Sequence, residues 1–364
     1  MLTQEINASP SVRVAIIGYG LAGSVFHAPL IDAIPGMQVS AIVTSKPERQ
    51  QSAHQRYPHA KILTHVKELW HDAGDYDLVV VATSNSTHVT LGSAAMRAGL
   101  PVVVDKPMAA TVADAQRLLS TSQDTGQLLT IFQNRRWDND FLTVKKILAS
   151  NLLGPITRFE SRFERYRPTP RHGVWRESAD PQAAGGQLYD LGSHLIDQAL
   201  HLFGTPEQVY AEMEIRRPGA LVDDDSFVAL RFPSGITAHL WMSQVARISG
   251  PRVRLCGLHG TYEKWGLDPQ EDALRAGKQP GAADWGSEPR ELWGRVSTTL
   301  ESTGLHLDGP IETVPGAYEQ FYAGVRDSII QIAPVPVDPA SVIDVIRVIE
   351  AAQASAREHS VITF

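Results

Sequence analysis

A short glycine-rich stretch near the N-terminus constrains the fold of this chain more than any other feature. Val12–Ile17 is an apolar run typical of a buried strand, and the segment 18–23, Gly-Tyr-Gly-Leu-Ala-Gly, follows it directly and opens a helical stretch. In this context Gly18 permits a tight turn, Gly20 lets a pyrophosphate approach the backbone, and Gly23 lets the helix pack on the strand. The competing interpretation is an ordinary glycine turn. We predict a dinucleotide site, and the residues expected there are Gly18, Gly20, Leu21, Ala22 and Gly23.

The residues after the second expected strand, 38–43, bear on the choice of cofactor. This strand ends in Thr44-Ser45-Lys46, and Arg49 follows one helical turn later. An NAD site usually carries an acid here to accept from the ribose 2′-hydroxyl, whereas hydroxyls and cations suit a 2′-phosphate. Ser45, Lys46 and Arg49 therefore predict NADP, with NAD as the weaker alternative. The other interpretation is a solvated helix start with surface charges.

Further apolar runs alternate with helical stretches along the first third of the chain. Strands are expected at 76–82, 102–104 and 127–132, with one helix ending near Gly99 and another beginning at Thr111. Strands separated by helices predict a doubly wound parallel sheet of the Rossmann type. Ligands of such sheets lie in the crevice beyond the carboxyl ends of the strands.

Polar residues follow two of these strands and are expected at the crevice. Pro107 ends one strand and keeps Lys106 out of helical geometry, so the Lys106 ammonium should point toward a bound cofactor rather than into solvent. His88 is expected to be a positioned helix residue rather than a catalytic base. The residues of these two loops predicted to contact the cofactor are Ser84, Asn85, His88, Asp105 and Lys106.

Two adjacent arginines, Arg135 and Arg136, follow the last strand of this pattern and should also lie near the crevice. They could hold an anion of the cofactor, and Arg135 is the candidate for that role. They could equally pair with Asp138 and Asp140. The sequence leaves both interpretations open.

The pattern changes after residue 150. The segment 156–166 alternates polar and apolar residues with a period of two, which indicates a half-covered strand. Further strands at 208–216, 225–232, 236–245 and 252–255 predict an α+β domain with a large, mostly antiparallel open sheet.

Two expectations follow from this arrangement. The domains expected are 1–132, which binds the dinucleotide, and 133–364, which binds substrate. An open sheet face needs cover, so association into a homodimer or homotetramer through that face is predicted. Residues 266–309, rich in Gly, Pro and polar groups, are expected to form an extended excursion, followed by helices at 315–331 and 339–358.

The second half contains one constellation of acid–base residues. Asp190 and His194 are four residues apart and would share a helix face, with Asp197 and His201 further along and a Gly-Gly pair before them. Three interpretations compete: a satisfied buried histidine, a metal site, and a general acid–base pair. The third fits a nicotinamide site best, because removing an alcohol proton needs a base and no metal.

Composition excludes several classes of partner. A formal charge of −7 and an isoelectric point near 6.0 give no general attraction to nucleic acid or to an anionic membrane. No apolar run approaches the roughly 20 residues of a membrane span, and residues 1–11 are expected to be a loose tail, too polar for a signal peptide. The single Cys256 suits a cytoplasmic protein.

With these residues laid out, the chain resembles the glucose–fructose oxidoreductase/inositol dehydrogenase/rhizopine-catabolism family over essentially its whole length. Within the family it is most similar to the NADP-dependent scyllo-inositol 2-dehydrogenases. The segments that carry the family resemblance are 18–27, Asp105-Lys106-Pro107, 134–143 and 189–197, and those that carry the branch resemblance are 44–46, 165–168 and 270–277.

The resemblance implies a catalytic group of Lys106, Asp190 and His194, a Trp175–Arg176 pair near the nicotinamide, and a cis Lys106–Pro107 bond. One departure is Asp105, where the family usually has Glu. The implied activity is reversible oxidation of a secondary alcohol on a polyol ring, scyllo-inositol to scyllo-inosose with NADP. The alternatives are another inositol, an aldose or a keto-sugar as substrate, or a cofactor-binding regulator without turnover.

Overall fold

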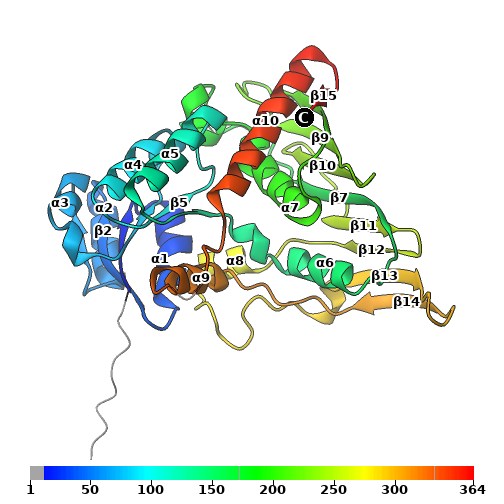
Figure 1. Ribbon diagram of the computed structural model, residues 1–364, viewed down its shortest axis with the longest axis horizontal. Helices are drawn as coiled ribbons and strands as arrows, with labels where there is room; N and C mark the ends of the chain where they lie inside the picture. Colours follow the sequence, from blue (N-terminus) through cyan, green and yellow to red (C-terminus); the bar gives the residue numbers. More distant parts are fainter. Residues whose placement is uncertain (1–11, 172, 332) are drawn as a thin grey trace, which may run out of the picture.

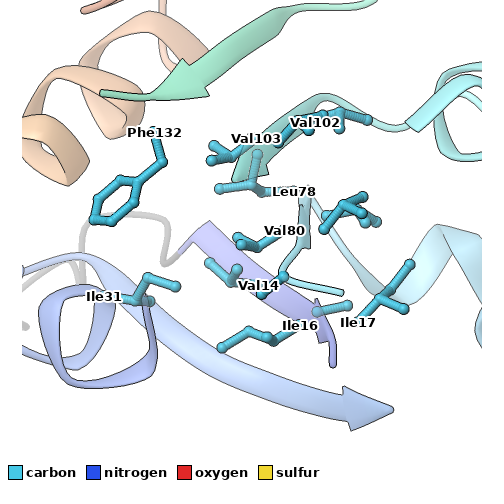
Figure 2. Packing of buried hydrophobic residues seen from close by; sticks show 14 of the residues in the cluster. Val14, Ile16, Ile17, Ile31, Leu78, Val80, Val102, Val103 and Phe132 are labelled. Atoms are coloured by element: carbon cyan, nitrogen blue, oxygen red, sulfur yellow. The ribbon is translucent and has the colours of Figure 1, made fainter. Parts of the chain in front are cut away.

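A six-stranded parallel sheet forms the first half of the computed structural model, which describes residues 12–171, 173–331 and 333–364. The tail expected for residues 1–11 lies outside the described residues. Apolar side chains from neighbouring strands, such as Val14, Leu78 and Val103, pack against one another between the sheet and its helices (Figure 2). In spatial order the strands are β3 (Lys61–Leu63), β2 (Met37–Val43), β1 (Val12–Ile17), β4 (Leu78–Val81), β5 (Val102–Asp105) and β6 (Leu129–Phe132).

Helices connect these strands, as the alternation in the sequence predicts. The first helix after the glycine turn starts as a π-helix before becoming α-helical. Thr111 caps α5 by accepting from the Asp114 backbone N–H at 3.1 Å, and Gly126 ends it with a positive φ. The helices are η1 (Ala22–His27), α1 (Ala28–Asp32), α2 (Pro47–Arg56), α3 (Val66–His71), α4 (His88–Arg97) and α5 (Val112–Thr125). The doubly wound Rossmann-type sheet is confirmed.

The second half is organised around a nine-stranded sheet in which only β7 and β10 pair in parallel and every other neighbouring pair is antiparallel. The large, mostly antiparallel sheet is therefore confirmed. Its strands in spatial order are β14 (His306–Ile311), β13 (Gly294–Thr299), β12 (Gly260–Lys264), β11 (Val253–Gly257), β7 (Ile156–Glu164), β10 (Thr237–Ser243), β9 (Asp225–Arg231), β8 (Gln208–Glu214) and β15 (Ile362–Thr363).

Helices cover one face of this sheet, between it and the first half of the molecule (Figure 1). Alternation along β7 gives the sheet one apolar face for the helices to cover. Phe159 and Phe163 are buried under the helices, while Arg158 and Arg162 stay partly exposed on the other face. No helix in the described ranges is both long and apolar enough to span a bilayer. The helices of this half are α6 (Asn139–Ala149), α7 (Ser193–Phe203), α8 (Gln270–Arg275), α9 (Glu319–Ile329) and α10 (Pro339–Glu358).

The extended excursion expected over 266–309 contains regular elements that the sequence did not predict. This stretch contains helix α8 and strand β13, and β14 begins within it, so it extends the sheet at one edge. The register of β13 alternates buried Val296 and Thr298 with more exposed neighbours. Strand β14 has mostly exposed side chains and includes a Gly and a Pro, as edge strands often do.

The C-terminal helices return to the first half of the chain. Helix α9 places Phe321 against Phe132 of β6, with ring centroids 5.0 Å apart. Helix α10 is capped by Asp338, which accepts from the Ala340 N–H at 2.9 Å, and begins with a Pro in its first turn, as expected. Its apolar residues are divided between two cores, with Ile346 in the first cluster and Ile349 in the second. The domain boundary between 132 and 133 stays a prediction.

Candidate active site

The glycine turn has the geometry that a dinucleotide needs. Gly18 has φ +98°, and a Cβ there would overlap the Ala82 carbonyl, while a Cβ at Gly23 would overlap the Gly18 carbonyl. Gly20 leaves the backbone open, and the Arg49 guanidinium lies over it, with Nη1 3.5 Å from where a Cβ would stand. The turn thus fits a pyrophosphate approaching the helix N-terminus, and Leu21 and Ala22 carry the next backbone groups.

The side chains predicted to choose between NADP and NAD lie on one short segment. Ser45 and Lys46 are exposed at the end of β2, where Lys46 is the residue before α2. Arg49 comes from the first turn of α2 and reaches back to the glycine turn. The described structure places no acidic residue between Thr44 and Pro47, and the first acid after this segment is the exposed Glu48 in the first turn of α2.

The loop after β4 connects the two halves of the molecule. Asn85 is buried, and its Nδ2 donates to the Ala183 carbonyl at 2.7 Å. Ser84 remains exposed beside it. This contact ties the cofactor-side loop to the segment that precedes the Asp190 helix.

His88 has a structural role that replaces its predicted contact with the cofactor. It is 0% exposed, and its Nδ1 donates to the Pro107 carbonyl at 2.8 Å, so its ring is enclosed behind the Lys106 loop. Burial lowers its pKa, an effect that outweighs the nearby Asp105 charge. The interpretation of His88 as a positioned helix residue therefore holds.

Asp105 and His27 shape the turn that presents Lys106. Asp105 Oδ1 accepts from the Lys106 backbone N–H at 2.8 Å and lies 3.8 Å from His27 Nε2, while His27 Nδ1 bonds the Tyr322 hydroxyl at 2.6 Å. Burial alone would raise the pKa of Asp105, but the nearby His27 ring and the other neighbouring positive charges lower it overall. The Lys106–Pro107 bond is cis, as the resemblance implies.

Lys106, Asp190 and Arg176 meet at the junction of the two halves. Lys106 Nζ donates to the Asp190 carbonyl at 2.6 Å and to its Oδ1 at 3.1 Å, and Arg176 Nε donates to Oδ2 at 2.8 Å. Burial alone would raise the pKa of Asp190, but the charges of Lys106 and Arg176 lower it to about 2. Burial lowers the pKa of Lys106, and Asp190 offsets this only in part.

Two of the three N–H groups of the Lys106 ammonium are thus committed to Asp190, and the third has no partner among the residues that the structure describes. Asp190 holds the lysine rather than standing free for a ligand. Arg176 extends over Trp175, with its Cζ 4.3 Å from the ring centroid, so the predicted Trp175–Arg176 pair flanks the Lys106–Asp190 pair.

His194 is buried on α7, one turn after the π-helical turn η7 (Leu188–Gly192) that carries Asp190. Its Nδ1 is enclosed and has no hydrogen-bond partner among the described residues. Burial and the positive charge of Lys106 are the two largest causes that hold the pKa of His194 well below its usual value of about 6.5. The imidazole is therefore neutral at pH 7 and able to accept a proton. Three arginines act in the same direction, namely Arg135, Arg252 and Arg176.

The two arginines left open by the sequence are both paired. Arg135 bonds Asp138 at 3.3 Å and Glu271 at 3.0 Å, and Arg136 forms a two-pronged pair with Asp197 at 2.7 and 2.8 Å. The pairing interpretation is thus the observed one: Arg135 pairs with the predicted Asp138 and also with Glu271, whereas Arg136 pairs with Asp197 and not with Asp140. The Asp197 carboxylate is therefore occupied by the Arg136 guanidinium. The metal interpretation of this helix required that carboxylate as a metal ligand.

One functional element was missed at the sequence level. Arg252, just before β11, is buried beneath His194 and pairs with Asp140 at 2.9 Å. Its Cζ lies 4.1 Å from the Phe163 ring, whose other cationic neighbour is Arg135 at 4.8 Å. The alternation along the strand does not mark Arg252, because this residue directly precedes β11 and its neighbour Val253 takes the buried register. Its acidic partner lies on α6, far away in the sequence.

Together the glycine turn, the lysine held by a carboxylate and the neutral buried histidine define an oxidoreductase that binds a nicotinamide dinucleotide. The sequence matches the oxidoreductase family with an NAD-binding Rossmann fold over residues 12–133 and the GFO/IDH/MocA C-terminal domain over 141–263. The chain belongs to the GFO/IDH/MocA family of oxidoreductases.

Relatives match along nearly the whole chain. It is 38% identical to scyllo-inositol 2-dehydrogenase (NADP(+)) IolW of Bacillus subtilis, over 96% of this chain and 94% of that protein. It is also 38% identical to the uncharacterized oxidoreductase YdgJ of Escherichia coli, over 97% and 98%. A solved oxidoreductase structure from Bacillus subtilis superposes with a TM-score of 0.91 at 37% identity, covering 98% of this chain and 99% of that one.

Proposed function

We propose that this protein oxidises a secondary alcohol of a cyclic polyol, with scyllo-inositol as the substrate and NADP as the hydride acceptor. The observation that carries the proposal is the environment of the Lys106 ammonium. Asp190 fixes this group through two hydrogen bonds and leaves one N–H to donate, and a neutral histidine, His194, comes from the other half of the molecule. The similarity to a relative named as an NADP-dependent scyllo-inositol 2-dehydrogenase supports the choice of substrate.

The bound dinucleotide would supply the acceptor for the hydride of the carbinol carbon. His194 takes the hydroxyl proton at Nε2, because Nδ1 is enclosed. Lys106 donates its remaining N–H to the same oxygen and stabilises the negative charge that develops there. Asp190 keeps the ammonium in place, and Arg176 holds Asp190. The residues proposed to hold the dinucleotide are Gly18, Gly20, Leu21, Ala22, Gly23, Ser45, Lys46, Arg49, Ser84, Asp105 and Arg176.

A panel of alcohols tests the substrate class. Purified protein is mixed with NADP or NAD and with each inositol isomer, several aldoses and open-chain polyols, and reduced cofactor is followed by absorbance. We expect turnover with scyllo-inositol and NADP, and slower turnover with NAD. No reduced cofactor with any polyol would refute the proposed function, and preference for an aldose would change the substrate.

Removal of Arg49 tests the cofactor. Because its guanidinium lies over the glycine turn beside the exposed Lys46, Arg49→Ala should raise the KM for NADP about 10- to 100-fold, the effect of losing hydrogen bonds to a charged group. The KM for NAD should change less than threefold. Arg117→Ala, which removes an exposed arginine of α5, is the matched control. Equal effects on both cofactors would contradict the assignment of the 2′-phosphate site.

We further propose that the uncovered face of the nine-stranded sheet joins subunits into a dimer or tetramer. This face carries half-buried aromatic residues, and the Arg162 guanidinium lies 3.8 Å from the Trp241 ring centroid. Phe227 and His239 pack against Trp241 and against each other. A solution mass equal to the single 39.8 kDa chain would contradict this. A cytoplasmic location stays a prediction.

A further inference from the structure

Arg165 stands on the same sheet face as the residues around His194. It is the first residue after β7, and its backbone N–H still donates to the Ser243 carbonyl at 2.8 Å, so strand geometry continues through it. Because side chains alternate along a strand, Arg165 shares the inner face with Phe163. The Phe163 ring is buried, 6.5 Å from the His194 ring, so Arg165 lies one step beyond it toward the strand end.

Arg165 lies near three charged groups of the site and near Arg167, an exposed cation outside it. Its neighbours include two acids, Asp190 and Glu271, and two cations, Arg135 and Arg167. Burial and the two cations lower its pKa, and the two acids offset this only in part. The side chain therefore shares its electrostatic surroundings with Asp190, which holds Lys106, and with Glu271 of helix α8.

The Arg165 guanidinium makes no hydrogen bond or ion pair within the described parts of the chain, although the residue is half-buried. The other cations of the site all have partners, since Lys106 and Arg176 hold Asp190 and Arg135 holds Glu271. A partly desolvated cation without a partner is costly unless something hydrogen-bonds to it. A guanidinium has five N–H donors in a planar fork, suited to two oxygens side by side.

We propose that Arg165 binds the substrate, with its guanidinium fork donating to two neighbouring hydroxyl oxygens of the polyol while Lys106 and His194 act on a third. This inference rests on the proposed function and deepens it. Arg165 then selects substrates that carry vicinal hydroxyl groups, because a simple alcohol leaves its donors unpaired.

Two substitutions test the proposal, using the polyol on which the wild-type enzyme is most active. Arg165→Gln should raise the KM for the polyol about 10- to 100-fold, the loss expected for hydrogen bonds from a charged donor. The KM for NADP should remain within threefold of wild type. Arg165→Lys keeps the charge but loses the planar fork of donors. Its KM for the polyol should therefore fall between the values of wild type and Arg165→Gln.

Arg167→Gln is the matched control, because Arg167 is an exposed cation only two residues away. Its KM for the polyol should stay near the wild-type value. An unchanged KM in Arg165→Gln, or an equal rise in Arg167→Gln, overturns the assignment and leaves the proposed function intact. A wild-type enzyme that oxidises no polyol overturns both.

Discussion

Replacing Lys106 by methionine is expected to lower kcat for polyol oxidation about 100- to 1,000-fold, the usual cost of removing one donor from a site of developing negative charge. The free N–H of the ammonium is the part of the structure aimed at that charge, since Asp190 occupies the other two. Methionine keeps the length and apolar volume of the side chain but cannot donate. Steady-state rates at saturating NADP measure the effect.

The structure also predicts what this substitution leaves unchanged. The glycine turn follows β1 and Arg49 lies on α2, so neither is part of the Lys106 loop. The affinity for NADP, measured by fluorescence titration, should therefore stay within threefold of wild type. Lys145→Met, at an exposed position of α6, provides a matched control and should retain full activity. If Lys106→Met keeps more than a tenth of the wild-type kcat, the oxygen is stabilised by another group.

His194→Gln is expected to reduce kcat about 100- to 10,000-fold, the range that general acid–base assistance contributes. Glutamine is similar in size and polar, but it cannot take up a proton at neutral pH. In the wild-type enzyme the pKa of His194 lies below its usual value of about 6.5 because of burial and the Lys106 charge. The histidine becomes protonated, and thus inactive as a base, only below that pH.

A pH profile separates this role from a structural one. The rate of alcohol oxidation by wild type should stay level from pH 8 down to about 6.5 and decline only at lower pH. His194→Gln should lack that decline. His201→Gln, two turns along the same helix and more exposed, should behave like wild type. A loss of tenfold or less in His194→Gln would assign proton removal to another residue.

Local sequence signals predicted the cofactor half well. Val12–Ile17 and the glycine turn combine strand propensity, turn chemistry and helix start within a few residues, so no distant contact is needed to interpret them. The same holds for α10, where Asp338, Pro339 and the apolar stripe fall within one helix. The Lys106 turn was predictable for the same reason.

The sheet edge and the site partners depended on contacts that the local sequence does not encode. Strand β14 buries few side chains and contains Gly309 and Pro310, so it lacks the apolar alternation that marks a strand. Arg176 is 14 residues from Asp190 and Glu271 is 136 residues from Arg135. Which acid meets which cation is decided by the packing of separate elements, so the sequence left the alternatives open.

Helix α10 has a mechanical consequence for the whole molecule. Its 20 residues form a rod about 30 Å long that is embedded at one end in the first core and at the other in the second. Any hinge that separated the two halves would have to break this rod or extract it from one core. The spacing between the ammonium and the imidazole is thus held by a helix that packs in both cores.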